Sequence, residues 1–519
     1  MNPVVPTPVI LGAAGLTPAD VIAVARAGAR VEVSPDALVA LGRGRAVVDK
    51  LAGSGTATYG VSTGFGALGS EYIAPELRGR LQHALVRSHA AGMGPPVEAE
   101  VVRALMLLRL RTLTTGCTGV RPIVAETLAA LLNAGIVPAV REHGSLGCSG
   151  DLSPLAHVAL VLLGEGEVIG PDGHLTDSGP VLAAHGIRPL DLEPKEGLAL
   201  INGTDGMLGM LILATADFGR LLKNADIAAA MSIEALRGTG RVFDPQLHAL
   251  RPHPGQAASA ANLALLLAGS GITTPQAGAD REQVQDAYSL RCAPQVAGAA
   301  RDTLAHALTV AERELASAID NPVVLVAQDR IESNGNFHGA PLAFVLDFLA
   351  IAAAETGSIA ERRTDRILDP ARSQGLPPFL AAEPGLDSGL MIAQYTQAAL
   401  LADTKRLATP ASVDSIPTSA MQEDHVSMGW SAARKLRTAL NNLTGILSIE
   451  MLTAARALDL RSPLKPAPAT AAAVTALRAA GVGGPGADRY LSPELRAAEA
   501  AVRSGAVLDA VEESVGALR

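Results

Sequence analysis

Apolar residues recur at every third or fourth position along much of this chain, mainly beyond residue 207. Such spacing is typical of helices that bury one face. It predicts long helices without internal proline over residues 207–236, 297–318, 341–364, 391–408 and 427–458. Long helices with short connections indicate a bundle, so we expect a mainly α protein.

The N-terminal part of the chain has a mixed pattern. Thr17-Pro18 and Ser34-Pro35 are typical of helix starts, with a capping hydroxyl before a proline. Residues 55–70 and 142–157 are rich in small residues and predict two long loops, and residues 166–195 predict short β-like segments. Loops of that length inside a compact domain are usually functional or disordered.

These patterns predict three regions within one integrated catalytic unit. Residues 1–200 form a smaller mixed α/β region that carries both loops, residues 201–460 form the central long-helix bundle, and residues 461–519 form a C-terminal helical cap.

The composition supports helical packing. Of 519 residues, 48% are hydrophobic but only 3% are aromatic, so the interior must be aliphatic, which favours closely packed helices. The net charge is −9, and basic residues form no stripe, so we expect no nucleic-acid partner.

The cysteines and the N-terminus indicate a reducing compartment. Cys117, Cys148 and Cys292 are too few and too scattered for a disulfide framework or a zinc site. The N-terminus has no basic segment before its apolar stretch, and no run of about 18 uncharged apolar residues occurs. We therefore expect a cytoplasmic protein with no metal and no membrane-spanning helix.

One glycine pattern has an alternative interpretation. Gly64, Gly66 and Gly69 match a GxGxxG dinucleotide motif. No hydrophobic strand precedes it and no βαβ rhythm follows, so the glycines are better explained by the loop.

The second loop contains Cys148-Ser149-Gly150 within the segment Gly144-Ser-Leu-Gly-Cys-Ser-Gly-Asp-Leu-Ser-Pro-Leu-Ala-His157. This segment resembles the signature of the histidine and aromatic amino-acid ammonia-lyases. In that family the tripeptide cyclises autocatalytically to a methylidene-imidazolone electrophile (MIO), and no external cofactor is needed. The family commonly has Ala where this chain has Cys148. Gly150 lacks a Cβ, so its nitrogen can approach the carbonyl of residue 148.

The resemblance extends over about residues 55–460 and implies roles for further residues. Tyr59, in Tyr-Gly-Val-Ser-Thr-Gly-Phe-Gly, is identified as the general base, and Asn202 as a hydrogen-bond donor near the tripeptide. In Gln285-Asp-Ala-Tyr-Ser-Leu-Arg-Cys292, the match assigns Tyr288 to charge stabilisation and Arg291, with Gln285, to the substrate. A planar guanidinium suits a carboxylate.

Four more residues bear on the substrate by the same resemblance. Phe337 would wall off water, whereas Ser88-His89 and Glu423 resemble the histidine-specific members. A polar pair suits an imidazole, which needs a donor and an acceptor. The expected reaction is elimination of ammonia from L-histidine to give trans-urocanate.

The resemblance also implies a homotetramer of long helices whose active sites take residues from three chains. Alternatives remain open: an aminomutase with the same electrophile, a tyrosine or phenylalanine lyase, or a non-catalytic helical scaffold. An aspartase-type lyase is also helical, but its GSSxMPxKxNP loop is absent from this sequence.

Overall fold

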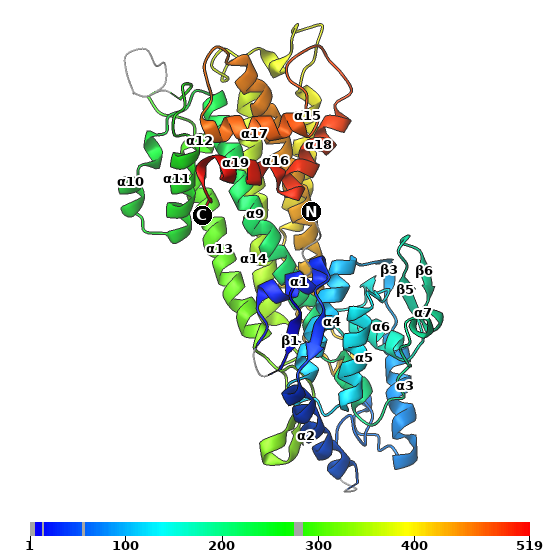
Figure 1. The fold of residues 1–519 in the computed structure, drawn as a ribbon. Coiled ribbons are helices and arrows are strands. Elements are labelled where there is room, and N and C mark those ends of the chain that lie inside the picture. Colours follow the sequence, from blue (N-terminus) through cyan, green and yellow to red (C-terminus); the bar gives the residue numbers. More distant parts are fainter. Residues whose placement is uncertain (1–5, 13–14, 54–57, 274–283) are drawn as a thin grey trace. The chain divides into compact units, whose positions relative to one another are not determined.

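The computed structural model describes residues 6–12, 15–53, 58–273 and 284–519. The chain divides into two compact units (Figure 1). The first unit comprises Met1–Leu213, Leu308–Leu346 and Pro410–Arg434, and the second comprises Ala214–Ala307, Asp347–Thr409 and Lys435–Arg519. Because each unit is assembled from separated stretches, the division into residues 1–200, 201–460 and 461–519 stays a prediction.

Four long helices have residues in both units and confirm the mainly α expectation. They are α9 (Asp205–Ala235), α13 (Ala293–Leu315), α14 (Ala340–Leu368) and α16 (Gly429–Leu460). With α15 (Met391–Leu407), they match the five predicted helices to within a few residues at nearly every end.

The first unit carries short helices and short strands around the start of α9. Its helices are α1 (Pro18–Ala27), α2 (Pro35–Ala52), α3 (Arg78–His89), α4 (Ala99–Leu113), α5 (Pro122–Asn133), α6 (Leu152–Leu162), α7 (Ser178–Ala184) and α8 (Glu196–Ile201), with 3-10 turns η1 (Gly66–Leu68), η2 (Pro75–Leu77), η4 (Val326–Gln328) and η6 (Ser419–Met421). Helices α3, α6 and α8 pack against one another, and α4 packs on α1 and α5.

The strands pair only two by two in the described residues. They are β1 (Val9–Leu11), β2 (Val31–Val33), β3 (Met93–Pro96), β4 (Arg141–His143), β5 (Glu167–Ile169), β6 (Leu175–Asp177), β7 (Val323–Leu325) and β8 (Arg330–Glu332). β1 pairs with β2 in parallel, and the other three pairs are antiparallel. β5 and β6 are the short β segments predicted within residues 166–195.

Helix starts follow the local chemistry of the sequence. Thr17 Oγ1 accepts from the backbone N–H of Asp20, and the Asp20 carboxylate accepts from the N–H of Thr17, which completes a capping box. Ser34 caps α2 by accepting from the N–H of Ala37 at 3.2 Å. Both predicted helix starts are confirmed.

The second unit contains parts of the four long helices, the helix α15 and several shorter helices. Its remaining elements are η3 (Arg241–Phe243), α10 (Pro245–Ala249), α11 (Pro254–Leu266), α12 (Tyr288–Arg291), η5 (Pro378–Leu380), α17 (Pro468–Ala479), α18 (Ser492–Ser504) and α19 (Ala506–Val515). Helix α17 packs on α19 and α11, and α18 packs on α19.

Two helical segments have the length and composition of a membrane span, and the expectation that no helix crosses a membrane stays a prediction. Glu196–Ala235 and Ala340–Leu368 are both long and apolar enough. The apolar window of the first is 100% buried within the protein, and that of the second is 61% buried. The aliphatic interior that the composition predicts explains this: core helices built from Ala, Leu and Ile look like spans.

Candidate active site

A cavity of about 370 Å³ in the first unit brings the two predicted loops together. It is lined by Tyr59, Gly66, Cys148, Ser149, Asn321, Ser333, Asn334, Phe337, His338, Gln422, Glu423, Asp424 and His425. Five predicted site residues, namely Tyr59, Cys148, Ser149, Phe337 and Glu423, therefore share one cavity although the sequence separates them widely.

The tripeptide sits in a loop whose shape requires glycine. Gly150 has a φ of 72°, and a Cβ there would lie 2.2 Å from the carbonyl oxygen of Gly203. No side chain fits at that distance. The loop is held from outside, because the Gly147 carbonyl accepts from Ser427 Oγ at 2.7 Å and from the Gly339 N–H at 3.0 Å.

Asp151 joins this loop to the start of α9. Its Oδ2 accepts from the N–H groups of Gly206 and Met207, both at 2.9 Å, and its Oδ1 accepts from Ser145 Oγ at 2.8 Å. The carboxyl group is fully buried, and this burial raises its pKa to about 7. Asp151 thus satisfies helix N–H groups that would otherwise lack a partner.

The Glu423 carboxylate is the hydrogen-bond centre of the cavity. Ser149 Oγ donates to its Oε1 at 2.9 Å, and Cys148 Sγ and Thr418 Oγ1 donate to its Oε2 at 3.1 and 3.0 Å. Burial and the neighbouring carboxylate raise the pKa of the Cys148 thiol to about 12. The thiol is therefore protonated at neutral pH.

Tyr59 lies beside this cluster on its own loop. Its hydroxyl oxygen accepts from the N–H of Gly66 at 2.9 Å, and its ring meets Phe65 edge-on at 6.4 Å. Ser419, in the turn before Glu423, accepts from the N–H of Ala67 at 3.4 Å. Val61 anchors the loop, because its side chain is buried in a cluster with valines of α2 and β7.

Asn202 occupies the turn between α8 and α9 and is 4% exposed. Its Nδ2 donates to the carbonyl oxygen of Ser149 at 3.2 Å, and its own carbonyl accepts from the buried Arg109 at 2.7 Å. Among the described residues, none donates to Asn202 Oδ1. Asn202 therefore touches the tripeptide directly, as its assigned role requires.

His89 is near Glu423 but does not line the cavity. Its Nδ1 lies 2.9 Å from the Leu85 carbonyl oxygen. Burial lowers the pKa of His89, and the charge of Glu423 opposes that shift. A neutral ring near the acid fits the predicted polar environment, but direct contact with substrate stays a prediction.

The remaining predicted residues belong to the second unit. Gln285 is exposed, and Tyr288 and Arg291 lie on α12, where the Arg291 guanidinium stacks 4.7 Å above the Tyr288 ring. Tyr288 is 71% exposed. Contact of these three residues with the substrate stays a prediction.

Sequence reasoning missed several residues of the cavity wall. Asn334 Nδ2 donates to the Asp320 carbonyl at 2.9 Å, and the Asn334 N–H donates to Asn321 Oδ1 at 3.0 Å, so two asparagines support each other. His338 and His425 stack at 5.6 Å with their rings nearly parallel. Of these, Asn334, His338 and His425 stand inside matched motifs, whereas Asn321 gives no local signal.

The single tryptophan of the chain lies behind the tripeptide loop. Trp430 is 2% exposed, and its indole N–H donates to the Glu142 carbonyl at 2.7 Å. A Cβ on Gly206, in the first turn of α9, would lie 2.5 Å from the Trp430 ring.

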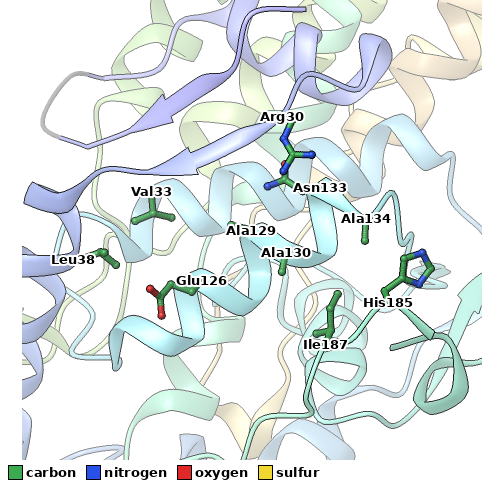
Figure 2. A pocket seen from close by; sticks show the side chains of 10 residues that line it. All are labelled: Arg30, Val33, Leu38, Glu126, Ala129, Ala130, Asn133, Ala134, His185 and Ile187. Atoms are coloured by element: carbon green, nitrogen blue, oxygen red, sulfur yellow. The ribbon is translucent and has the colours of Figure 1, made fainter. Parts of the chain in front are cut away.

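A second hollow, of about 470 Å³, lies over α5 (Figure 2). Its polar groups are either bound to the backbone or exposed to solvent. Asn133 uses both amide atoms on the backbone of Val31, and Arg30 and Glu126 are exposed. In the described part of the chain, no group of three or more His, Cys, Asp or Glu residues could hold a metal ion.

The helical fold, with the Cys148-Ser149-Gly150 tripeptide, Glu423 and Tyr59 at one cavity, is the arrangement expected of an ammonia-lyase from the sequence resemblance. The chain belongs to the aromatic amino acid lyase family, whose model matches residues 16–479. It is 66% identical over 511 residues to the histidine ammonia-lyase of Streptomyces coelicolor, covering 98% of this chain and 99% of that protein.

Two solved structures are similar along the whole chain. The tyrosine aminomutase of Streptomyces globisporus has a TM-score of 0.93 at 40% identity, covering 99% of this chain and 100% of that one. The histidine ammonia-lyase of Trypanosoma cruzi has a TM-score of 0.89 at 38% identity, covering 98% and 96%.

Proposed function

We propose that this enzyme eliminates ammonia from L-histidine to give trans-urocanate, the first step of histidine degradation. The observation that carries the proposal is the hydrogen bond from Ser149 to Glu423 in the cavity that Tyr59 also lines. The full-length similarity to a histidine ammonia-lyase supports the choice of substrate.

The electrophile is the MIO group formed from Cys148, Ser149 and Gly150. The residues fit it, because ring closure needs a position 150 without a side chain and Gly203 leaves no room for one. When formed, the group supplies an electrophilic methylidene carbon that activates the amino group of the substrate for departure. Asn202 holds the Ser149 carbonyl in place.

Tyr59 serves as the general base for the β-proton. The N–H of Gly66, 2.9 Å from its oxygen, stabilises that oxygen while it carries negative charge. The edge of Phe65 fixes the ring. Proton transfer then needs no large movement of the loop.

Glu423 and Phe337 shape the substrate end of the cavity. The carboxylate pairs with the imidazole or with the amine proton, and His89 adds a second polar group behind it. Phe337 excludes water. A phenyl substrate would leave these polar groups unpaired, which costs binding.

Arg291, Tyr288 and Gln285 act from another copy of the chain in a homotetramer. Arg291 binds the substrate carboxylate, and Tyr288 stabilises charge beside the electrophile. Supporting this, Tyr288 is 71% exposed, and the second unit also exposes Phe348 and Ile351 on α14. Apolar side chains repeated along one helix face suit burial between subunits.

Spectrophotometry tests the function directly. L-Histidine should produce the urocanate absorbance band, whereas L-tyrosine and L-phenylalanine should give no coumarate or cinnamate. Ser149→Ala is the matched control: it should fold, keep its unprocessed mass and lose nearly all activity. A Ser149→Ala variant with normal turnover would refute the electrophile.

An aminomutase is the second candidate, favoured by the similarity to a tyrosine aminomutase. Both reactions use the same residues and differ in whether ammonia returns to the β-carbon. Mass spectrometry of the product decides: urocanate with free ammonia supports the lyase, and a β-amino acid supports the aminomutase.

Complementation tests the shared site. Ser149→Ala and Arg291→Ala, each inactive alone, should regain part of the activity when co-expressed, since mixed tetramers contain some sites with both native residues. No recovery in isolated mixed tetramers would place Arg291 in its own chain's site.

We also propose a cytoplasmic location, which suits three unpaired cysteines.

A further inference from the structure

Among the described residues, three side chains donate to the Glu423 carboxylate, and one of these donors is lost when the electrophile forms. Ser149 Oγ donates to Oε1, whereas Cys148 Sγ and Thr418 Oγ1 both donate to Oε2. Dehydration of Ser149 removes its hydroxyl as water. Of the contacts that the described residues make, those at Oε2 then remain and the one at Oε1 is gone.

We propose that the Cys148 side chain is a positioning residue: its thiol, together with the Thr418 hydroxyl, holds Oε2 of Glu423 so that Oε1 is presented to the substrate. This inference rests on the proposed function and extends it. Ring closure uses only backbone atoms of residue 148, so it assigns no role to the thiol.

The thiol is suited to donate rather than accept. It is 8% exposed and lies 3.1 Å from a carboxylate oxygen, so a thiolate there would be poorly hydrated and would face a like charge. Burial and Glu423 raise its pKa to about 12, which keeps the proton on sulfur. A protonated thiol is a weak but directed donor.

Thr418 is the second donor to Oε2 of Glu423, and its backbone is also tied to that of Glu423. Backbone N–H groups of Thr418 and Glu423 each donate to the other residue's carbonyl, at 3.0 and 3.3 Å. Between them Ser419, Ala420 and Met421 have φ values of 50°, 51° and 68°. This left-handed turn without glycine is costly and fixes the backbone of Glu423. The thiol then fixes the side chain.

The test compares Cys148→Ala, Cys148→Ser and Thr418→Val with the wild type in the full-length enzyme. Intact mass first establishes that each variant has lost two waters, one from ring closure and one from Ser149. We expect kcat/KM for L-histidine to fall about fivefold in Cys148→Ala, and Cys148→Ser to restore it to within about twofold, since a hydroxyl replaces the donor. In Thr418→Val, kcat/KM should fall at least as far as in Cys148→Ala.

The pH profile separates positioning from a merely structural role. Losing a donor makes proton uptake by Glu423 easier, so the acidic limb of kcat/KM should move to higher pH in Cys148→Ala and return in Cys148→Ser. The other titratable groups around the acid, which are Tyr59, His89, His338, Asp424 and His425, are the same in all variants.

Infrared spectroscopy gives a readout independent of turnover. The chain has three cysteines, so the S–H stretch of Cys148 is identified by its loss in Cys148→Ala. It should shift towards a weaker hydrogen bond in Glu423→Gln. An unshifted band, or an acidic limb unchanged in the fully processed Cys148→Ala variant, would overturn the inference. Absence of urocanate from the wild type would instead refute the proposed function, and the infrared shift would still decide the thiol contact.

Discussion

Replacing Asp151 by Asn should make the protein more stable in mildly alkaline solution and should flatten its stability against pH. The carboxyl group is completely buried at the junction of the tripeptide loop and α9. Asn can still accept from the two helix N–H groups through its single oxygen, and its NH₂ can donate to Ser145 Oγ. The variant therefore keeps the contacts and removes the buried charge.

The magnitude follows from the pKa. Burial raises the pKa of Asp151 from 3.8 to about 7, so the folded chain holds this proton more tightly than the unfolded chain. Stability therefore falls as the pH rises from about 4 to about 7. A shift of roughly three units corresponds to at most ~4 kcal/mol, and relaxation of the site should reduce this to about 2 kcal/mol.

The assay is chemical denaturation of wild type and Asp151→Asn at pH 5 and pH 8. The wild type should lose stability relative to the variant between these two conditions. Asp151→Ala is the contrasting change, because it leaves the N–H groups of Gly206 and Met207 without a partner and should cost about 2–5 kcal/mol at either pH. Equal pH dependence in wild type and Asp151→Asn would refute the buried-charge explanation.

Three further substitutions test other parts of the structure. Gly150→Ala should keep its unprocessed mass, because a Cβ would lie 2.2 Å from the Gly203 oxygen; loss of both waters in this variant would contradict the geometry. Arg291→Lys should raise KM for L-histidine by about tenfold or more while the mass stays processed, since Lys cannot form two parallel bonds to a carboxylate, and steady-state kinetics checks this. Arg363→Met should lower the free energy of unfolding by about 3–5 kcal/mol, since it removes the ion-pair partner of the buried Glu450 side chain, and unchanged thermal stability would argue against that pair.

The sequence predicted the long helices well because their signal is local and repeated. The segment 391–408 corresponds to α15 at Met391–Leu407, and the Thr17 and Ser34 caps lie where hydroxyls precede prolines. The tripeptide, Tyr59 and Glu423 were found through resemblance to a family. Their meeting in one cavity depends on folding, which periodicity cannot show.

Other features have no signal in a single sequence. Asn321 lines the cavity and accepts from the N–H of Asn334, which is 13 residues further along the chain. The turn at Ser419–Met421 is left-handed without any glycine, so local propensity predicts the opposite. Arg109 looks like a surface residue of an amphipathic helix, yet it is 1% exposed and holds the Asn202 carbonyl. Long-range contacts alone place it there.

The position of Trp430 gives this enzyme a built-in optical reporter. It is the one tryptophan among 519 residues, and it lies against the first turn of α9, beside the loop in which we propose that the electrophile forms. Its fluorescence therefore comes from one place in each chain, where the indole N–H donates to the carbonyl of Glu142 in the same loop as the tripeptide. Comparing the emission of wild type and Ser149→Ala would follow maturation in unlabelled protein, in real time and without substrate.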